Sequence, residues 1–431
     1  MGKSVAFHNL GCKVNSYETE KMMKELAEKG YNIIPFDQKA DIYIINTCSV
    51  TNIADRKTRQ MLNRARRLNP DAVIVAAGCY VNTRRARGVI PEEADICVSN
   101  EEKRDIAGIL DGYFAGREKT ESDNGCRSDL PEDALHTRCF IKVQDGCNQF
   151  CSYCIIPYAR GRICSRTVRE IIEETRQYVK AGYKEFVPTG IHISSFGKDR
   201  EADHEDLLGL LRAMSETEGV ERIRLSSLEP RTVTEEFAAG LREIKQICPH
   251  FHLSLQSGSD TVLKRMNRRY TTDEYAEAVN ILRGCFDDPA ITTDIITGFP
   301  GETETEFEET VGFVQRMNFY ETHVFKFSRR RGTAADRMEG QLTEAVKHER
   351  SVVLMKINAE KKREFEDRHI KTGARAEVLF EDLEEAGGRI LRSGYTREYL
   401  KVYDERGAFD AGDIAEGSIR RQGEVILFER T

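Results

Sequence analysis

The sequence predicts a multidomain α/β protein with a Rossmann-like N-terminal α/β domain, a partial TIM-type (β/α)6 barrel and a small C-terminal β-barrel. Strand and helix patterns alternate twice along the chain, over residues 5–116 and again over 139–369. Such alternation favours parallel sheets that helices cover. Short β-prone runs with glycine-containing turns fill residues 370–431, which is typical of a small barrel. We therefore expect domains at 1–116, 137–369 and 370–431, with a linker at 117–136.

The first domain is predicted to hold strands at residues 5–7, 41–46, 72–77 and, more weakly, 94–98. Helical patterns lie between these strands at 19–29 and 54–68, where apolar residues recur at helical spacing. The stretch 117–136 is polar and charged and has no periodicity, so it is predicted as a linker.

The barrel domain is predicted from six strands, at residues 140–143, 185–187, 222–226, 250–255, 291–296 and 322–327. Helical patterns separate these strands at 169–181, 234–247, 273–285 and 304–317. Thr303 and Glu306 match a capping box at the start of the last of these helices. A long charged helix at 343–369 closes the domain. The β-prone runs of the final domain are 376–380, 389–391, 399–403 and 424–429.

The composition is that of an ordinary globular protein, with 431 residues, 39% hydrophobic and 32% charged residues, and a net charge of −7. No apolar run reaches membrane-spanning length, and the N-terminus lacks a signal-peptide pattern. We therefore expect a cytoplasmic protein with no membrane partner. The net charge does not indicate nucleic-acid binding, so any such surface must be local. Twelve cysteines in a reducing compartment indicate metal binding or catalysis.

Three cysteines, Cys147, Cys151 and Cys154, form a C-x-x-x-C-x-x-C pattern that can fold three thiolates around one metal centre. Three thiolates are one too few for a closed [4Fe–4S] site. One iron would keep an open coordination position, which is what a metal uses for chemistry. The alternatives are a zinc site or unrelated core cysteines. A structural zinc site usually needs four ligands, and no His or Cys follows Cys154 closely enough to complete a pair.

A second set of cysteines, Cys12, Cys48 and Cys79, follows three predicted strands of the first domain. In a parallel sheet the carboxyl ends of strands share one rim, where open α/β folds bind ligands. Gly11 and Gly78 directly precede two of the cysteines and allow the backbone to turn close to a bound group. Two interpretations stay open: a second cluster that is again one ligand short, or three buried strand-end cysteines.

The other cysteines lack both the spacing and the shared placement of the two sets and are predicted as ordinary thiols: Cys97, Cys126, Cys139, Cys164, Cys248 and Cys285.

Residues at the carboxyl ends of barrel strands are candidates for cofactor contacts, because functional groups lie there in barrels of this type. These candidates are Thr189, Gly190, Ser227, Glu229, Gln256, Asp294 and Gly298. Tyr153, between the last two cysteines of the triplet, can pack on an adenine ring.

With these features placed, the chain resembles the methylthiotransferase branch of radical S-adenosylmethionine (SAM) enzymes over almost its whole length. The stretches that carry the resemblance are Gly11–Asn15, Phe140–Cys147, Cys154–Gly161, His252–Asp260 and Met266–Thr271. The resemblance implies an N-terminal methylthiotransferase domain, a radical SAM barrel and a C-terminal TRAM domain. It also implies two [4Fe–4S] clusters.

In that family the cluster on the triplet Cys147, Cys151 and Cys154 would bind SAM and, when reduced, cleave it to a 5′-deoxyadenosyl radical. The N-terminal set would hold the cluster that carries the sulfur to be inserted. The resemblance further implies an electron donor such as a flavodoxin or ferredoxin. Its finer form indicates methylthiolation at C2 of N6-threonylcarbamoyladenosine, next to the anticodon (position 37), so that the partner is the anticodon stem-loop of tRNA.

Two departures from the family pattern keep alternatives open. Cys164 stands where the family usually has Arg, and Lys326-Phe327-Ser328 stands where it often has Pro-Tyr-Ser. The Lys326 version is closer to sister enzymes that act on isopentenyladenosine, and a third class modifies an aspartate of a ribosomal protein. An alternative of a different class is a non-catalytic iron–sulfur electron carrier, but such a carrier needs four-ligand clusters, which both triplets contradict.

RNA contact has weak independent support from the sequence. Basic residues cluster at 84–87, 265–269 and 329–331, and phosphate contacts need cations. The final domain has more acidic than basic residues, so its role in RNA binding rests on the resemblance. Its predicted contacts are Tyr395, Arg397, Tyr399 and Lys401.

Overall fold

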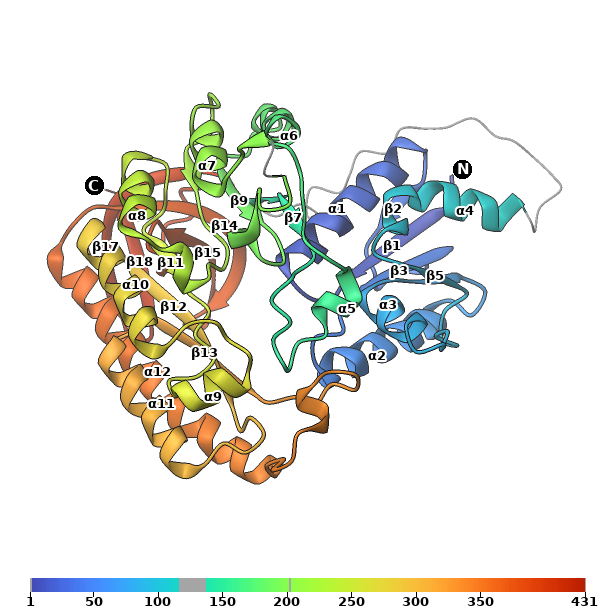
Figure 1. Ribbon diagram of the computed structural model, residues 1–431. Helices are drawn as coiled ribbons and strands as arrows, with labels where there is room; N and C mark the ends of the chain where they lie inside the picture. The colour runs from blue at the N-terminus through green and yellow to red at the C-terminus, as the bar shows by residue number, and fades with distance from the viewer. Residues whose placement is uncertain (1, 116–136, 201–202, 431) are drawn as a thin grey trace. The chain divides into compact units, whose positions relative to one another are not determined.

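The computed structural model describes residues 2–115, 137–200 and 203–430, which confirm the multidomain α/β class (Figure 1). They form two compact units. The first comprises the described part of Met1–His136 with Asp145–Ile163 and Ser328–Asp336, and the second comprises Thr137–Gln144, Cys164–Phe327 and Arg337–Thr431. The predicted linker at 117–136, with Cys126, lies outside the described residues.

A parallel sheet of five strands forms the centre of the first unit. Its strands are β1 (Ser4–Asn9), β2 (Asn32–Ile34), β3 (Ile42–Thr47), β4 (Val73–Gly78) and β5 (Ile96–Val98). They stand in the order β2-β1-β3-β4-β5, and every neighbouring pair is parallel. This is the flavodoxin-like order, in which ligands bind beyond the carboxyl ends of β1 and β3. Strand β2 was not predicted from the sequence. It has only three residues, of which one is buried, and this is too short for an alternation of apolar and polar residues to be recognised.

Helices cover both faces of this sheet because its central strands are apolar on both sides. All residues of β3 and β4 are buried. Ile42 and Ile44 pack with α1 (Lys13–Glu28) and α4 (Ile106–Ala115), whereas Tyr43 and Ile45 pack with α2 (Asn52–Leu68). Figure 1 shows these helices around the blue strands. The unit also holds α3 (Cys79–Arg85), the short helix η1 (Glu102–Asp105) and α5 (Ile156–Arg160).

The second unit contains the predicted six-stranded partial barrel. Its strands are β6 (Cys139–Lys142), β9 (Glu185–Thr189), β10 (Arg222–Ile223), β11 (His250–His252), β12 (Ala290–Thr297) and β13 (Glu321–Lys326). They form two parallel sheets, ordered β10-β9-β6 and β11-β12-β13. A parallel bridge between Leu228 and Leu253 joins the two sheets. The short segments β7 (Gln144–Asp145) and β8 (Cys164–Ser165) complete the strands of this region.

Seven helices of the second unit follow in chain order: α6 (Val168–Lys180), α7 (Leu207–Ser215), α8 (Glu235–Glu243), α9 (Asp260–Arg265), α10 (Thr272–Cys285), α11 (Glu304–Met317) and α12 (Glu344–Thr372). The predicted capping box is present, because the Thr303 side chain accepts from the Glu306 amide and Glu306 accepts from the Thr303 amide. Short helices are η3 (Ile193–Ser195), η5 (Pro230–Thr232) and η6 (Ala335–Arg337). The long helix α12 packs along β13, where the Thr322 amide donates to Asn358 at 2.6 Å.

The C-terminal segment closes into a five-stranded barrel, as predicted (Figure 1, red). Its strands are β14 (Ala376–Ala386), β15 (Arg389–Thr396), β16 (Lys401–Asp404), β17 (Ile414–Gln422) and β18 (Val425–Arg430). Strand β17 closes the barrel on β14, and β16 pairs in parallel with β18. The sequence missed β17, since Gly417, Arg420 and Arg421 interrupt any alternation of apolar residues.

Buried ion pairs attach the C-terminal barrel to the amino-terminal ends of the (β/α)6 strands. Glu185 begins β9 and contacts the guanidinium groups of Arg222 at 2.8 Å and Arg224 at 2.7 Å. These two arginines also donate to main-chain oxygens of the C-terminal barrel, at Thr396 and Arg397. Because all three side chains are buried, each charge depends on the others for compensation.

Of the four residues predicted to contact RNA from this domain, Arg397 and Tyr399 take part in the attachment. Arg397 donates to the carbonyls of Lys245 and Ile247 at 2.6 and 2.8 Å. The Tyr399 hydroxyl accepts from Arg138 at 2.6 Å, and Tyr395 stacks on Tyr399 with ring centroids 4.5 Å apart. Lys401 pairs with Glu384.

Among the described residues, no helix has the length and apolar character needed to cross a bilayer.

Candidate functional site

The structure brings Cys12, Cys48 and Cys79 together at the carboxyl ends of β1, β3 and β4. Cys12 caps α1 at its N-terminus, and Cys79 is the first residue of α3. Burial raises the pKa of the Cys48 thiol to about 11, and the neighbouring Cys79 and Cys12 add to the rise. A Cβ on Gly11 would lie 3.0 Å from the Cys48 Cβ, so glycine permits this approach. Cys12 is exposed and Cys48 half-buried, unlike ordinary core cysteines.

A buried polar group surrounds Cys79. The Lys103 ammonium donates to the Glu18 carboxylate at 2.7 Å and to Asn100 Oδ1 at 3.0 Å. Asn100 Nδ2 in turn donates to the Cys79 Sγ at 3.6 Å. Burial lowers the pKa of Lys103, which Glu18 partly offsets. Sequence reasoning missed these residues, because each stands in an ordinary polar context and Glu18 lies 85 positions from Lys103.

The second set, Cys147, Cys151 and Cys154, lies on a tight loop of the same unit, between β7 and α5. The Cys154 amide donates to the Cys151 carbonyl at 3.0 Å, and the Cys147 amide donates to the Gly161 carbonyl at 3.1 Å. All three thiols are half-buried. Gly146 is required before Cys147, because it has φ +69° and a Cβ there would lie 1.9 Å from the Arg162 carbonyl oxygen.

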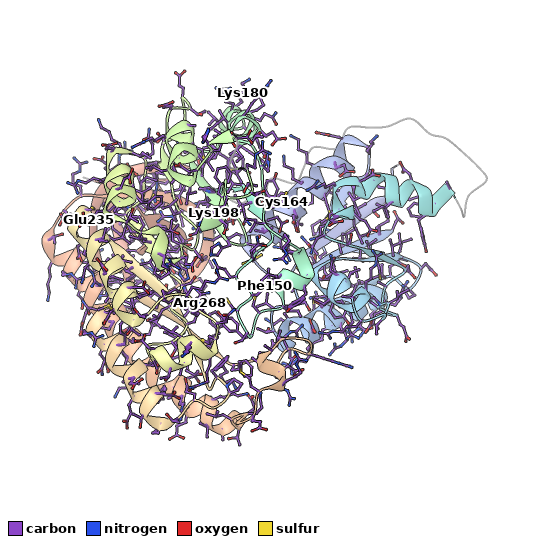
Figure 2. The ribbon with its side chains drawn as sticks, viewed as in Figure 1. Phe150, Cys164, Lys180, Lys198, Glu235 and Arg268 are labelled. Atoms are coloured by element: carbon purple, nitrogen blue, oxygen red, sulfur yellow. The ribbon has the colours of Figure 1, made fainter. Side chains whose placement is uncertain are left out.

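Aromatic residues of this loop surround the triplet. Phe150, labelled in Figure 2, has a positive φ of 50° between two of the cysteines. Its ring meets that of Tyr158 edge-on at 6.0 Å, and the Arg162 guanidinium lies 4.8 Å from its centroid. Tyr153, the predicted adenine contact, is half-buried on the same loop. Tyr158 is 57% exposed, so its apolar surface remains available to a ligand.

Arg160 connects the two cysteine sets within the first unit. Its fully buried guanidinium contacts Glu18 at 2.9 Å and Asp145 at 3.1 Å, and donates to Asn15 Oδ1 at 2.7 Å. Burial lowers the pKa of Arg160, but Cys79, Glu18 and Asp145 together raise it well above its ordinary value. Asn15 and Glu18 belong to α1, which starts after Cys12, whereas Arg160 ends the helix that follows Cys154. The two cysteine loops are therefore held together by buried charge.

The remaining candidates lie in the second unit, at or near strand ends. Glu229 contacts His192 at 3.3 Å, and Thr189 is buried at the end of β9. Burial alone would raise the pKa of Glu229, but His192, with Arg268 and Lys198, lowers it below its ordinary value. Gln256 is buried with a positive φ of 75°, a strained conformation that is often found at functional sites. Ser227 is exposed.

The two candidate glycines do not face open space. A Cβ on Gly298 would lie 2.3 Å from the Lys347 side chain, and one on Gly190 would lie 2.8 Å from Gln144 Oε1. Each glycine therefore accommodates a protein side chain. The contact of their backbone with a cofactor stays a prediction.

The predicted candidate Asp294 lies in a polar group on three neighbouring barrel strands, whose two histidines the sequence did not reveal. His252, Asp294 and His323 belong to β11, β12 and β13, and their ligand-type atoms all lie within 4.8 Å of one another. The His252 Nε2 is 3.3 Å from an Asp294 oxygen. The only signal in the sequence was that each of the three residues stands within a predicted barrel strand.

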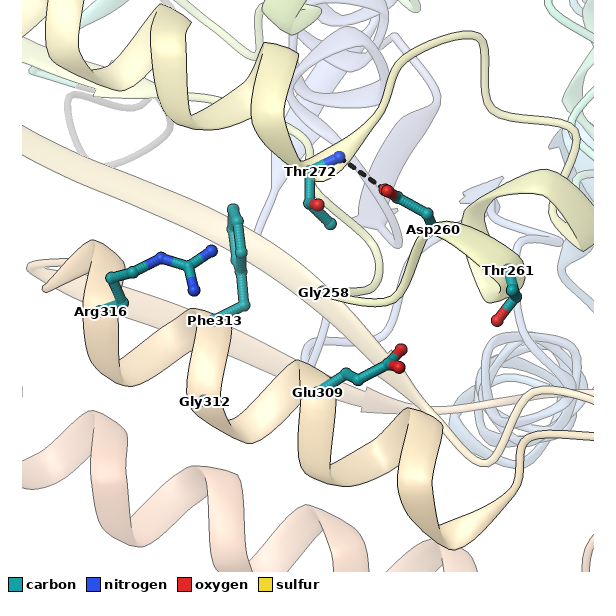
Figure 3. A pocket seen from close by; sticks show the side chains of 8 residues that line it. All are labelled: Gly258, Asp260, Thr261, Thr272, Glu309, Gly312, Phe313 and Arg316. Atoms are coloured by element: carbon teal, nitrogen blue, oxygen red, sulfur yellow. Dashed lines mark hydrogen bonds between the residues drawn. The ribbon is translucent and has the colours of Figure 1, made fainter.

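A separate hollow of about 440 Å³ opens on the flank of the barrel, between α9, α10 and α11 (Figure 3). The Thr272 amide donates to Asp260 across its upper edge at 2.7 Å, and Glu309, Phe313 and Arg316 line it from α11. None of the predicted site residues lines this hollow, so it does not belong to the candidate site.

The basic runs predicted to bind phosphate are partly neutralised by carboxylates. Arg265 pairs with Glu306 at 2.7 Å, and the buried Arg330 pairs with Asp55 at 3.1 Å. Arg85 pairs with Glu102 at 2.9 Å.

Among the cysteines predicted as ordinary thiols, Cys139 and Cys248 are buried, Cys97 and Cys285 half-buried, and Cys164 exposed.

Two family models match the chain: the Radical SAM superfamily over residues 141–314, and the Uncharacterized protein family UPF0004 over residues 4–99. The chain is 41% identical to the threonylcarbamoyladenosine tRNA methylthiotransferase MtaB of Bacillus subtilis, over 97% of this chain and 94% of that protein. It is 37% identical to the protein of the same name from Aquifex aeolicus, over 94% and 98%.

It is also 33% identical to the tRNA-2-methylthio-N(6)-dimethylallyladenosine synthase of a Thermoanaerobacter species, over 91% of this chain and 85% of that protein. Among solved structures, the radical SAM methyltransferase TsrM of Kitasatospora setae has a TM-score of 0.57 at 14% identity, covering 78% of this chain and 77% of that one. The likeness at this level of identity concerns the fold alone.

Proposed function

This chain belongs to the family of radical SAM tRNA methylthiotransferases, and from this premise we propose that it methylthiolates C2 of N6-threonylcarbamoyladenosine in the anticodon stem-loop of tRNA. The enzymes of this family transfer sulfur-containing groups and use SAM and two [4Fe–4S] clusters. The observation that supports the substrate is the higher identity to relatives named for threonylcarbamoyladenosine, 41% and 37%, than to one named for dimethylallyladenosine, 33%. An adenine C2–H is not acidic enough for removal by an ordinary base, which suits radical chemistry.

We assign the SAM-binding cluster to Cys147, Cys151 and Cys154, and the sulfur-carrying cluster to Cys12, Cys48 and Cys79. Both donor sets fit, since each offers three soft sulfur ligands from the first unit. When bound, the first cluster supplies the electron that cleaves SAM, and the second supplies sulfur. The protein's own part is to fix the two sets of ligands relative to each other, which the Arg160 contacts do.

The proposed SAM contacts remain Tyr153, Thr189, Gly190, Ser227, Glu229, Gln256, Asp294 and Gly298. Two of them have support from their surroundings. Glu229 is held as a carboxylate by His192 and suits an α-amino group. Gln256 is held in a strained backbone conformation that fixes its side chain.

We further propose the domain limits 1–116, 137–369 and 370–431, a cytoplasmic location, and a flavodoxin or ferredoxin as electron donor. The C-terminal barrel is proposed as a TRAM domain that contacts the RNA. Five-stranded barrels of this architecture bind oligonucleotides through their loops. The β14–β15 hairpin fits such a role better than the residues that attach the barrel, because it exposes Leu383 and Ile390.

Nucleoside mass analysis of tRNA from cells with and without the protein tests the proposal. We expect the methylthio form of threonylcarbamoyladenosine to disappear in the absence of the protein and the methylthio form of isopentenyladenosine to persist. The reverse pattern would place the chain in the sister class to which Lys326 is closer. Loss of neither nucleoside would direct attention to the ribosomal protein aspartate.

A further inference from the structure

We propose that His252, Asp294 and His323 form the subsite for the polar N6 substituent of the substrate adenosine. The inference rests on the proposed function and deepens it. The substituent of threonylcarbamoyladenosine carries a carboxylate, a hydroxyl and a carbamoyl N–H, whereas the dimethylallyl substituent carries only carbon and hydrogen. A subsite that tells the two apart must present hydrogen-bonding groups, and these three side chains are the ones that the barrel places together.

The three side chains face the concave side of the barrel. Their sequence neighbours Phe251, Leu253 and Ile295 are buried in the core that the strands share with the outer helices. Successive residues of a strand point to opposite faces of the sheet. The register pairs Asp294 with His323 on adjacent strands, so these two side chains project from the same level of the same face.

One histidine of the group is held by the protein and the other is available to a ligand. His252 has one ring nitrogen 3.0 Å from the Thr292 hydroxyl and the other 3.3 Å from Asp294. The exposed ring of His323 stacks on that of His252 at 5.7 Å but has no hydrogen bond to any part of the chain that the structure describes. His323 therefore has donor capacity that the protein itself leaves unused.

The hydrogen-bonding groups of the site match the threonyl end of the substituent. An N–H of His323 can donate to the carboxylate, and an Asp294 oxygen can accept from the hydroxyl. The His252 Nε2 lies 3.3 Å from an Asp294 oxygen and can donate a hydrogen bond to that carboxylate. Phe325, two residues further on the same face of β13, is 50% exposed and offers a surface on which the adenine can stack.

The same group disfavours an apolar substituent. If a dimethylallyl chain covered these side chains, it would remove water from the imidazole and the carboxylate without replacing its hydrogen bonds. Sites built around polar groups reject analogues that lack the matching group far more strongly than apolar pockets reject added ones. The subsite therefore acts in specificity, and its residues are distinct from the cysteines that hold the clusters. Asp294 is also one of the proposed SAM contacts, and the subsite assigns it to the substrate instead.

The test compares anaerobic holoenzyme variants on anticodon stem-loops that carry threonylcarbamoyladenosine, its threonyl methyl ester or dimethylallyladenosine. The ester keeps the shape but lacks the anionic carboxylate. We expect the wild type to prefer the acid to the ester in kcat/KM. His323→Phe should lower kcat/KM on the acid by about 10- to 100-fold, the effect of losing a hydrogen bond to a charged group. It should also abolish the preference for acid over ester.

Two controls allow these outcomes to be interpreted. Iron content and thermal unfolding of His323→Phe that match those of the wild type show that fold and clusters are intact. His348→Phe replaces an exposed histidine of α12 and should keep the wild-type acid-to-ester ratio. His323→Gln, which retains a donor, should recover part of the preference.

The possible failures are distinguishable. If the wild type modifies only the dimethylallyl stem-loop, the proposed function is wrong. If the wild type prefers the acid and His323→Phe keeps the same acid-to-ester ratio, the function stands and the subsite is wrong. Two histidines and a carboxylate can also bind a divalent cation. One equivalent of added zinc retained by the wild-type holoenzyme, but not by His323→Gln, would overturn the subsite in favour of a metal site.

Discussion

Each cluster cysteine has a role that a single substitution can test. Replacing Cys147, Cys151 or Cys154 by Ala should abolish reductive cleavage of SAM, because the iron site would lose one of three anchors. The measurement is the yield of 5′-deoxyadenosine from SAM and dithionite under anaerobic conditions. A normal yield from the triple variant would disprove the assignment, and Cys164→Ala, at an exposed thiol outside the loop, serves as the control.

The N-terminal cysteines should behave differently. Cys12→Ala, Cys48→Ala or Cys79→Ala should keep SAM cleavage and lose methylthiolation. In the triple variant, iron per chain should fall to about half, since one of two clusters is lost and its binding depends on these ligands. Unchanged iron content would show that the three cysteines are structural.

Gly146 provides a test of the loop itself. Gly146→Ala would bring a Cβ within 1.9 Å of the Arg162 carbonyl oxygen, so the turn before Cys147 must open and the adjoining cluster should be lost. Gly284→Ala is the matched control. It lies in α10 with nothing within 4 Å of the added carbon, and should stabilise the helix by about 0.5–1 kcal/mol. Iron content and thermal unfolding distinguish the two.

At the scale of elements, the contacts of Arg160 join α1 and α5. Arg160→Met should lower the free energy of unfolding by about 3–5 kcal/mol, because Glu18 and Asp145 would keep their charges without the buried cation. Arg176→Met, in an exposed pair with Glu173, should change it by less than about 1 kcal/mol. Denaturant unfolding measures both, and equal effects would show that the buried contacts do not stabilise the unit.

The attachment of the C-terminal barrel should depend on pH. Burial alone would raise the pKa of Glu185, but Arg224 and Arg222 lower it from 4.5 to about 2. A depressed carboxyl pKa stabilises the folded state above pH 4.5, and this contribution is lost as the pH falls towards 2. The stability difference between wild type and Glu185→Gln should therefore be constant above pH 4.5 and shrink below it. A difference that stayed constant down to pH 2 would contradict the pairing.

At the scale of the whole molecule, patterns within short stretches of the sequence predicted helices and strands well. Contacts between residues that are far apart in the sequence were not predicted. The apolar spacing and capping box around Thr303 predicted the helix at 304–317 with the bounds that the structure has. Short or half-exposed strands such as β2 and β17 lack a pattern of their own and form because neighbouring strands complete them.

The same division holds for the candidate site. The cysteines were found because their spacing, or their place after strands, is local information. The partnership of Arg160 with Glu18 spans 142 positions, and that of His252 with Asp294 depends on strand register. Tertiary packing brings such pairs together, so the partner of either residue cannot be identified from the sequence around it.

The first compact unit is assembled from three separate stretches of the chain, and this has a consequence for biosynthesis. Translation delivers Cys12, Cys48 and Cys79 early, but the loop that carries Arg160 emerges later, and Ser328–Asp336 later still. Glu18 can pair early with Lys103, but its second partner Arg160 is made later, and Arg330, the partner of Asp55, is made only after the barrel strands. The ion pairs that complete the first unit therefore form only after the barrel strands have been synthesised, and loading of either metal site is best completed after the ribosome has finished the chain.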